Sequence, residues 1–333
     1  MLKAEDIKKV GIGGAGTMGS SMAQIFAECG YDVKIYTRRQ ETLDKAKASI
    51  RSALDTKVET GDTTKEAADA AYARIEFTPA GDLTALADSD LIVENVAENM
   101  DIKHKFWAEI SALVSPDAIL TTNTSGLSIT KIAEAVVGPE RFCGFHWFNP
   151  PHIIPLIEVI NGDKTDPAVN DEVYKLSEMI GKKPIHVNKD ALGFIGNRIQ
   201  QAILREGLHI YQEGIGDFSD IDRCMKYGLG FRYACLGPFE IYDQGGVDIH
   251  YHIAEYTFPD LGDDKDPSKT YIGELMEKGY LGVKAGRGFY DYSNGKDKIA
   301  IKARDDMYLA LAKANITAIG DKAEEEMKKL DEK

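Results

Sequence analysis

The chain has 333 residues, which exceeds what one compact core usually holds, so we expect two domains. Hydrophobic residues make up 43% and charged residues 28%, the balance of a globular protein that buries a sizeable core. The formal net charge of −14 argues against nucleic acid or an anionic membrane surface as a partner, because phosphate binding requires a basic face.

The N-terminus and the cysteines favour a soluble, cytoplasmic protein. The opening segment MLKAEDIKKV is charged and leads straight into an expected strand, unlike a signal peptide. No run approaches the roughly 18 apolar residues of a membrane span. We interpret the cysteines, which form no CxxC pair, as small core residues in a reducing compartment. They are Cys29, Cys143, Cys224 and Cys235.

The first half of the chain alternates short apolar runs with amphipathic stretches. The expected strands are Lys9–Gly13, Asp32–Tyr36, Arg74–Phe77, Asp90–Glu94, Ala118–Thr122 and Phe142–Trp147. The clearest expected helices between them are Thr17–Cys29 and Glu41–Leu54. Strands that alternate with helices predict parallel βαβ units with both sheet faces covered. The expected fold class is therefore α/β, with a Rossmann-type doubly wound parallel sheet followed by an all-helical domain.

The pattern changes after about Lys189. Two more strands are expected before that point, at Ile154–Ile160 and Pro184–Val187. After it, Gly193–Glu213 is typical of one long helix, and 301–333 of a terminal helix that frays at its end. We therefore predict domains at 1–189 and 190–333. The second is small enough that we expect a partner subunit to cover its apolar face.

A glycine-rich motif directly follows the first expected strand. It reads G-x-G-x-x-G, with Gly14, Gly16 and Gly19. Gly14 permits the tight turn, Gly16 lets the backbone approach a pyrophosphate, and Gly19 allows close packing of helix on strand. Thr17 and Met18, at the start of the helix, belong to the same phosphate site, since free N–H groups there bind anions. In this context the motif predicts a bound dinucleotide, NAD or NADP.

The end of the second strand bears on the choice between those cofactors. An acidic residue usually holds the adenosine ribose of NAD there, but this chain has Thr37, followed by Arg38 and Arg39. Guanidinium groups would bind a 2′-phosphate that a carboxylate would repel, which favours tolerance of, or preference for, NADP. Alternatively, both arginines are solvated loop charges. The residues leave the choice open.

A histidine is the main candidate for a catalytic base. His146 stands among Phe145, Trp147 and Phe148, a setting more typical of a packed core histidine. Glu158, however, follows on the next expected strand after a Pro–Pro turn, and would orient His146 if the two strands lie side by side. Oxidising an alcohol requires a base that takes the hydroxyl proton while hydride leaves carbon, and a His–Glu pair suits that reaction.

Two further polar clusters follow strand ends, where open α/β sheets place their ligands. The run Thr121–Ser128 supplies hydroxyl and amide groups without a buried charge. Glu94 and Glu98 lie at another strand end, and we expect one of them to be structural. The sequence shows no HExxH and no paired CxxC, so we expect no metal. Without a GxSxG motif, a hydrolase has little support.

The ordered set of motifs resembles the L-3-hydroxyacyl-CoA dehydrogenase family. GxGxxG, VExxxEN, NTS, HxFNP, GFxxNR and LGVKAGRGFYDY occur in that order between about residues 8 and 293. The resemblance implies a dinucleotide-binding domain and a helical domain that forms a homodimer. It also implies direct hydride transfer between nicotinamide C4 and C3 of a short L-3-hydroxyacyl-CoA, such as 3-hydroxybutyryl-CoA.

The resemblance also assigns roles to matching positions. His146 would be the general base, paired with Glu158. Ser125 and Asn197 would hydrogen-bond the reacting oxygen of the substrate, with Asn149 supporting the substrate site. Glu98 and Lys103 match positions that lie near the cofactor or the substrate in the family, and both are assigned to cofactor binding together with Asn123.

Two stretches bear on the substrate. Many members read GYPMGPFE where this chain has GFRYACLGPFE, which is longer and includes Arg232. Together with NPPHIIPLIE it resembles the branch of L-gulonate 3-dehydrogenase and lambda-crystallin, whose substrate is a free hydroxy acid. Arg232 would then bind the carboxylate, or else pair with a surface acid. Candidates for the CoA phosphates, otherwise a solvated helix face, are Lys45, Lys47, Arg51 and Lys57.

Three functions are therefore weighed: a dehydrogenase of a CoA thioester, a dehydrogenase of a free 3-hydroxy acid, and a catalytically silent, crystallin-like structural protein. The intact set of Ser125, His146, Glu158 and Asn197 argues against the last.

Overall fold

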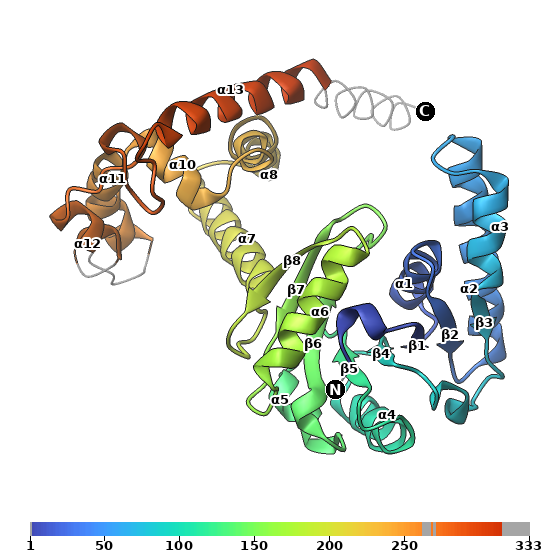
Figure 1. The fold of residues 1–333 in the computed structure, drawn as a ribbon. Coiled ribbons are helices and arrows are strands. Elements are labelled where there is room, and N and C mark those ends of the chain that lie inside the picture. The colour runs from blue at the N-terminus through green and yellow to red at the C-terminus, as the bar shows by residue number, and fades with distance from the viewer. Residues whose placement is uncertain (1, 262–267, 269–270, 315–333) are drawn as a thin grey trace. The chain divides into compact units, whose positions relative to one another are not determined.

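The computed structural model describes residues 2–261, 268 and 271–314 (Figure 1). The chain divides into two compact units, Met1–Gln201 and Ala202–Lys333. Within the described residues, we find no helix of the length and apolar character needed to cross a membrane. The part of the expected terminal helix at 315–333 lies outside the described residues.

The first unit is built on a sheet with the strand order β3-β2-β1-β4-β5-β6-β7-β8. These strands are β1 (Lys9–Gly13), β2 (Asp32–Tyr36), β3 (Ile75–Phe77), β4 (Leu91–Glu94), β5 (Ile119–Thr122), β6 (Phe142–Trp147), β7 (Leu156–Ile160) and β8 (Lys183–Val187). Every predicted strand is present. The order reverses at β1, where β2 and β4 flank it, as in a doubly wound sheet.

The strand β7 departs from the predicted parallel arrangement, since it runs antiparallel to β6. A parallel crossover needs a dozen or more residues, and the short proline-containing connection between β6 and β7 is too short for one. The chain turns back at once, and the register places His146 of β6 opposite Glu158 of β7. The pairing of these two strands therefore builds the centre of the site described below.

Helices cover both faces of this sheet. They are α1 (Thr17–Glu28), α2 (Gln40–Glu59), α3 (Lys65–Ala73), α4 (Met100–Leu113), α5 (Ile129–Ile132) and α6 (Pro167–Met179). Buried side chains of α1, α2, α3 and α6 form one hydrophobic cluster, and those of α4 and α5 form a second. α3 (KEAADAAYA) is missing from the prediction; its buried residues are the small Ala68 and Ala71. Short 3-10 turns lie at Ala4–Asp6, Leu83–Leu86, Ala133–Ala135, Pro139–Arg141 and Val283–Ala285.

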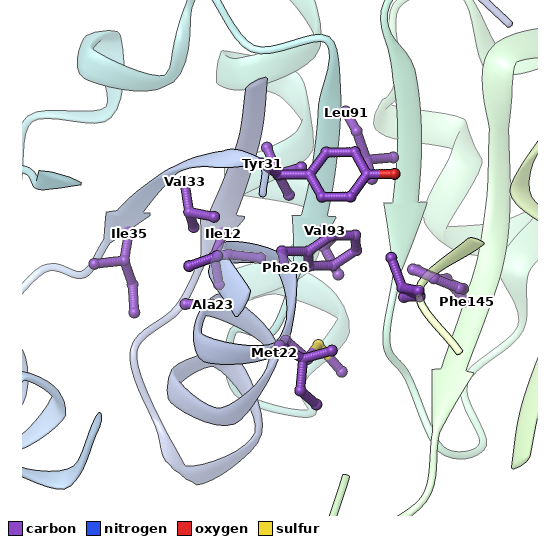
Figure 2. Close-up of a cluster of buried hydrophobic side chains, with 14 of the residues drawn as sticks. Ile12, Met22, Ala23, Phe26, Tyr31, Val33, Ile35, Leu91, Val93 and Phe145 are labelled. Atoms are coloured by element: carbon purple, nitrogen blue, oxygen red, sulfur yellow. The ribbon is translucent and has the colours of Figure 1, made fainter. Parts of the chain in front are cut away.

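The helix α1 packs tightly on the central strands (Figure 2). Its Met22 and Phe26 are fully buried against strand residues that include Ile12 and Val93. Phe26 also makes an edge contact with Tyr31, with the ring centroids 5.5 Å apart. This packing fixes the start of α1 close to the end of β1, which is where the glycine motif lies.

The second unit is helical in its described part. The helix α7 (Gly196–Gln212) starts in the first unit and continues into the second, and agrees with the predicted long helix. The helices that follow are α8 (Phe218–Cys224), α9 (Gly230–Tyr233), α10 (Pro238–Gly245), α11 (Val247–Asp260), α12 (Tyr271–Glu277) and α13 (Lys296–Ala314), with a π-helical turn at Met225–Leu229. Buried Asp243 accepts hydrogen bonds from the backbone N–H groups of Phe289 and Tyr290, which holds the LGVKAGRGFYDY segment in place.

Candidate active site

Two pockets of the first unit lie at the carboxyl ends of its strands. One, of about 860 Å³, is lined by the glycine motif and the end of β2. The other, of about 460 Å³, is lined by His146 and by polar residues that follow β4 and β5. Asn95 and Val96, directly after β4, line both pockets, so the two adjoin. Open α/β sheets bind their ligands at this edge.

Contacts within the protein explain why two positions of the motif, Gly14 and Gly19, must be glycine. Gly14 has a φ of +122°, and a Cβ atom there would lie 2.4 Å from the carbonyl oxygen of Asn95. A Cβ atom on Gly19 would lie 1.9 Å from the carbonyl oxygen of Gly14. At Gly16, in contrast, a Cβ atom would meet no protein atom within 4 Å. The space in front of Gly16 therefore opens to the larger pocket rather than to the core.

The residues of the larger pocket fit a dinucleotide. Gly16 precedes α1 and offers no side-chain cap, so the N–H groups at the start of the helix are free to bind a pyrophosphate. Gly14 and Gly16 line this pocket, Thr17 is exposed at the first turn, and Met18 lines the smaller pocket. Thr37 and Arg38 line the larger pocket at its other end, after β2.

The smaller pocket contains a buried His–Glu pair. The Nδ1 atom of His146 lies 2.7 Å from Oε2 of Glu158. The other oxygen of Glu158 accepts hydrogen bonds from the backbone N–H groups of Ile195, at 2.9 Å, and Gly196, at 2.8 Å. The carboxylate thus binds the histidine on one side and the N-terminus of α7 on the other, where the helix dipole favours a negative charge.

The charge of Glu158 determines the hydrogen-bonding role of His146. Burial raises the pKa of the Glu158 carboxyl, but the hydrogen bonds from His146, Gly196 and Ile195 outweigh it, and the pKa lies below its usual range. An ionised carboxylate only accepts hydrogen bonds, so Nδ1 of His146 must donate. The neutral ring then keeps its lone pair on Nε2, the nitrogen that is left to take a proton.

Of the three aromatic residues predicted around His146, Phe148 alone makes a ring contact with it. Phe145 and Trp147 point to the opposite face of β6, where their rings pack against each other in the core. The ring of His146 instead contacts Phe148, with centroids 4.7 Å apart, and Phe194, at 5.7 Å. Phe194 comes from the segment before α7 and is 2% exposed, and no periodicity in the sequence links it to His146.

Most hydroxyls of the predicted polar run are used within the protein. Thr121 donates to the carbonyl of Ile92, and Thr122 to the carboxylate of Glu94. Thr124 and Ser128 donate to Glu98 and Asp190. Ser125 is the exposed member of this group, and it lines the smaller pocket. Its hydroxyl is therefore the one that this run presents to a ligand.

The two glutamates after β4 have different surroundings. Glu94 is fully buried and accepts hydrogen bonds from Thr122, from the N–H of Val96 and from the Lys103 ammonium, so it is the structural one. Glu98 lines the smaller pocket, and one of its oxygens accepts a hydrogen bond from the N–H of Ser125.

Lys103 connects these two carboxylates. Its ammonium is fully buried, 2.7 Å from Glu94 and 3.4 Å from Glu98, and it lines neither of the two pockets. Burial raises the pKa of Glu98, but the hydrogen bond from Thr124 and the Lys103 charge bring it below its usual range. Lys103 is therefore placed to hold the Ser125 loop through Glu98.

Asparagines line much of the smaller pocket. Asn123 donates to Asn95 and accepts from the N–H of Trp147, which ties the ends of β4, β5 and β6 together. The side-chain amide of Asn197 donates to the carbonyl of Ser125, at 2.7 Å. Asn149 also lines the pocket, as does Gln200, which the sequence did not single out.

The remaining predicted residues lie elsewhere. Arg232 is exposed in α9 of the second unit. The basic residues of α2 pair with neighbouring carboxylates, as expected of a solvated helix face. These pairs are Lys45–Glu41, Lys47–Asp44, Arg51–Asp55, Arg51–Asp69 and Lys57–Glu28. In the described part of the chain, no three His, Cys, Asp or Glu side chains gather as metal ligands would.

We expect the stability of the protein to depend on pH through Glu158. The pKa of Glu158 in the folded protein lies below the value of about 4.3 in the unfolded chain. The ionised carboxylate therefore stabilises the fold fully at a pH above the unfolded pKa, and this contribution is lost as the pH falls through the folded pKa. Glu158→Gln removes the contribution. The difference in free energy of unfolding between wild type and E158Q should therefore be largest near neutral pH and shrink in acid.

Urea unfolding of both proteins across the acid to neutral range measures this difference. Glu41→Gln, which changes an exposed glutamate of α2, is the matched control. A difference between wild type and E158Q that stays constant with pH would show that Glu158 does not carry the linkage.

Comparison with protein families identifies the chain. The model of the 3-hydroxyacyl-CoA dehydrogenase NAD binding domain matches residues 9–191, and that of the C-terminal domain matches residues 193–292. The chain belongs to the 3-hydroxyacyl-CoA dehydrogenase family. This confirms the family predicted from the motifs, and with it an oxidoreductase with a Rossmann-type NAD-binding domain.

Relatives of this dehydrogenase cover most of its length. It is 36% identical over 290 residues to the 3-hydroxybutyryl-CoA dehydrogenase of Bradyrhizobium diazoefficiens, covering 87% of this chain and 97% of the relative. It is 35% identical over 293 residues to 5-formyl-3-hydroxy-2-methylpyridine 4-carboxylate 5-dehydrogenase of Mesorhizobium japonicum, covering 88% and 93%. The crystal structure of the 3-hydroxyacyl-CoA dehydrogenase of Archaeoglobus fulgidus superposes with a TM-score of 0.75 at 28% identity, covering 92% and 99%.

Proposed function

We propose that this enzyme interconverts an L-3-hydroxyacyl-CoA and the corresponding 3-oxoacyl-CoA with NAD or NADP as cofactor. The preferred substrates are short, such as 3-hydroxybutyryl-CoA. The observation that carries the proposal is the His146–Glu158 pair in a pocket that adjoins the dinucleotide pocket. A base and a hydride acceptor must meet the same carbinol group, and adjoining pockets allow this.

In the oxidation, bound NAD or NADP supplies the hydride acceptor at nicotinamide C4. His146 takes the hydroxyl proton on Nε2 as hydride leaves C3, and returns it in the reverse reaction. Glu158 remains ionised and stabilises the imidazolium that forms. Ser125 and Asn197 hydrogen-bond the reacting oxygen, and Asn149 supports the acyl group. Lys103 and Glu98 hold the Ser125 loop in position.

The charge of the smaller pocket favours a thioester over a free acid. Its lining within the described residues contains no lysine or arginine, and Glu98 is its acidic member. A free carboxylate buried there would lack a cationic partner, whereas a thioester carries no charge beside the reacting carbon. The second candidate, a dehydrogenase of a free hydroxy acid, is favoured by the relative that acts on a pyridine carboxylate, with Arg232 as the carboxylate ligand.

Initial rates of acetoacetyl-CoA reduction, followed at the nicotinamide absorbance, test the proposal. We expect turnover with this thioester and none with L-gulonate in the oxidative direction. Oxidation of L-gulonate without turnover of the thioester would favour the second candidate. Cofactor binding without turnover of either would favour a silent structural protein.

The domain roles follow from this function. We assign dinucleotide binding to 1–189, and dimerisation with a share of substrate binding through Asn197 to 190–333, a division supported by the family matches at 9–191 and 193–292. All four cysteines are free thiols, which supports a reducing, cytoplasmic location.

The helix α7 supports a homodimer. It contains no buried residue, although an apolar stripe runs along one side. The stripe consists of Ile199, Ile203, Leu204, Leu208 and Tyr211, each 45–53% exposed. A stripe of this size on a monomer would expose large apolar side chains to water.

We expect Leu204→Glu to convert the dimer to a monomer, because it places a charge in the apolar interface. Light scattering coupled to size-exclusion chromatography measures the mass. His209→Glu puts the same charge on the other side of α7 and should leave the dimer intact. A wild-type mass of one chain would contradict the proposed dimer.

A further inference from the structure

The adenosine end of the larger pocket lacks the acidic residue that would exclude a phosphorylated ribose. The residue directly after β2 faces the 2′ position of the ribose in this fold. Here it is Thr37, which is 9% exposed and lines the pocket. No residue of the described chain hydrogen-bonds its side-chain hydroxyl, while its backbone carbonyl accepts a hydrogen bond from Gly81. The hydroxyl is therefore available to a ligand.

Two arginines, Arg38 and Arg39, directly follow Thr37 in the sequence. Arg38 lines the same pocket, and neither it nor Arg39 forms an ion pair with any carboxylate of the described residues. The other basic residues of β2 and α2 are all paired: Lys34 with Asp88, Lys45 with Glu41, Lys47 with Asp44, Arg51 with Asp55, and Lys57 with Glu28. The chain has more acidic than basic residues, with a net charge of −14, so the unpaired state of Arg38 and Arg39 is not due to a lack of carboxylates.

The start of α2 adds further donors. Arg39 precedes this helix and provides no side-chain cap, and Thr42 of its first turn lines the pocket. The acidic residue of that turn, Glu41, is paired with Lys45 at 2.7 Å. The acidic lining residues Asp101 and Glu109 come from α4, together with Lys105. Two hydroxyls, a guanidinium and helix N–H groups thus lie near the end of β2. Glu109 of α4 is an acidic neighbour there, since burial and, after it, the charge of Glu109 raise the pKa of Tyr36.

We propose that this end of the pocket binds a 2′-phosphate, with Arg38 and Thr37 as its ligands, so that the enzyme binds NADP(H) more tightly than NAD(H). The inference rests on the dinucleotide-binding role in the proposed function and adds which cofactor is preferred. A guanidinium forms charge-assisted hydrogen bonds with phosphate, and replacing it leaves the phosphate without its main partner.

Calorimetric titration with adenosine 2′,5′-bisphosphate and adenosine 5′-monophosphate tests this directly, because the probes differ only in the 2′-phosphate. We expect the bisphosphate to bind wild type at least about tenfold more tightly. Arg38→Ala should remove most of that difference, and Thr37→Asp should reverse it. Arg74→Ala removes an exposed, ion-paired arginine away from the pocket and should change neither affinity.

Equal affinity of wild type for the two probes, or a preference that survives both R38A and T37D, would overturn the proposal. The titrations use no acyl substrate. A failure of thioester turnover with an intact preference for the bisphosphate would therefore contradict the proposed substrate alone. Binding of NADPH and NADH by the same variants, followed by nicotinamide fluorescence, should show the same order of affinities.

Discussion

Replacing His146 with Ala is expected to lower kcat for acetoacetyl-CoA reduction by a factor of about 10² to 10⁴, the usual contribution of a general acid or base. The substitution removes the nitrogen that exchanges the proton, while the glycine motif and Thr37 stay as they are. The Kd of the reduced cofactor should therefore change by less than about twofold. Steady-state rates and a fluorescence titration measure the two quantities.

His252→Ala, on the exposed surface of α11, is the matched control and should keep full activity. Thermal unfolding of the His146 variant separates a catalytic loss from a folding defect, since His146 is 3% exposed and its removal leaves a cavity. A folded His146→Ala protein with kcat close to that of wild type would remove His146 as the base.

Replacing Gly19 with Ala is expected to destabilise the protein by about 3 kcal/mol, at the upper end for an overpacked site. The new Cβ atom would lie 1.9 Å from the carbonyl oxygen of Gly14. That backbone has little room to withdraw, because the N–H of Gly14 donates to the carbonyl of Tyr36 at 2.9 Å. α1 would have to move off the sheet, against the packing of Met22 and Phe26.

Gly16→Ala is the variant to compare with Gly19→Ala, because it adds the same methyl group at another position of the motif. Its Cβ atom meets no protein atom within 4 Å, so the free energy of unfolding without cofactor should change by less than about 0.5 kcal/mol. The methyl group would occupy the space that the pyrophosphate needs, and we expect cofactor affinity to fall about tenfold. Urea unfolding and cofactor titration of both variants test the pair. Equal stability of the Gly19 and Gly16 variants would contradict the steric assignment.

The family and the fold class could be predicted from the sequence because their signals are local. Buried parallel strands are short apolar runs, and their predicted ends lie within two residues of the observed ones. The glycine motif can likewise be recognised in the sequence, because it is required by contacts between residues close in sequence, such as Gly14 and Gly19. α3 was not predicted, and the residues that it buries are the small Ala68 and Ala71 rather than large apolar side chains.

The tertiary structure alone decided which of the polar residues face a ligand. The sequence named His146 and Glu158, but only the antiparallel pairing of β6 and β7 brings them to 2.7 Å. The tertiary structure also places the ring of Phe194 beside His146. The hydroxyls of Thr121 and Thr122, near Ser125, form hydrogen bonds with the neighbouring strand β4.

The same division holds at the other pocket. Arg38 and Lys57 are both basic in the sequence, and only the fold pairs Lys57 of α2 with Glu28 of α1 while leaving Arg38 at the pocket without such a pair. The physical reason is the range of the interactions. Propensity and periodicity act over a few residues, so the sequence determines strands, helices and turns. The hydrogen bonds and ion pairs around the two pockets mostly join distant segments, so only the folded chain determines which polar groups remain free for chemistry.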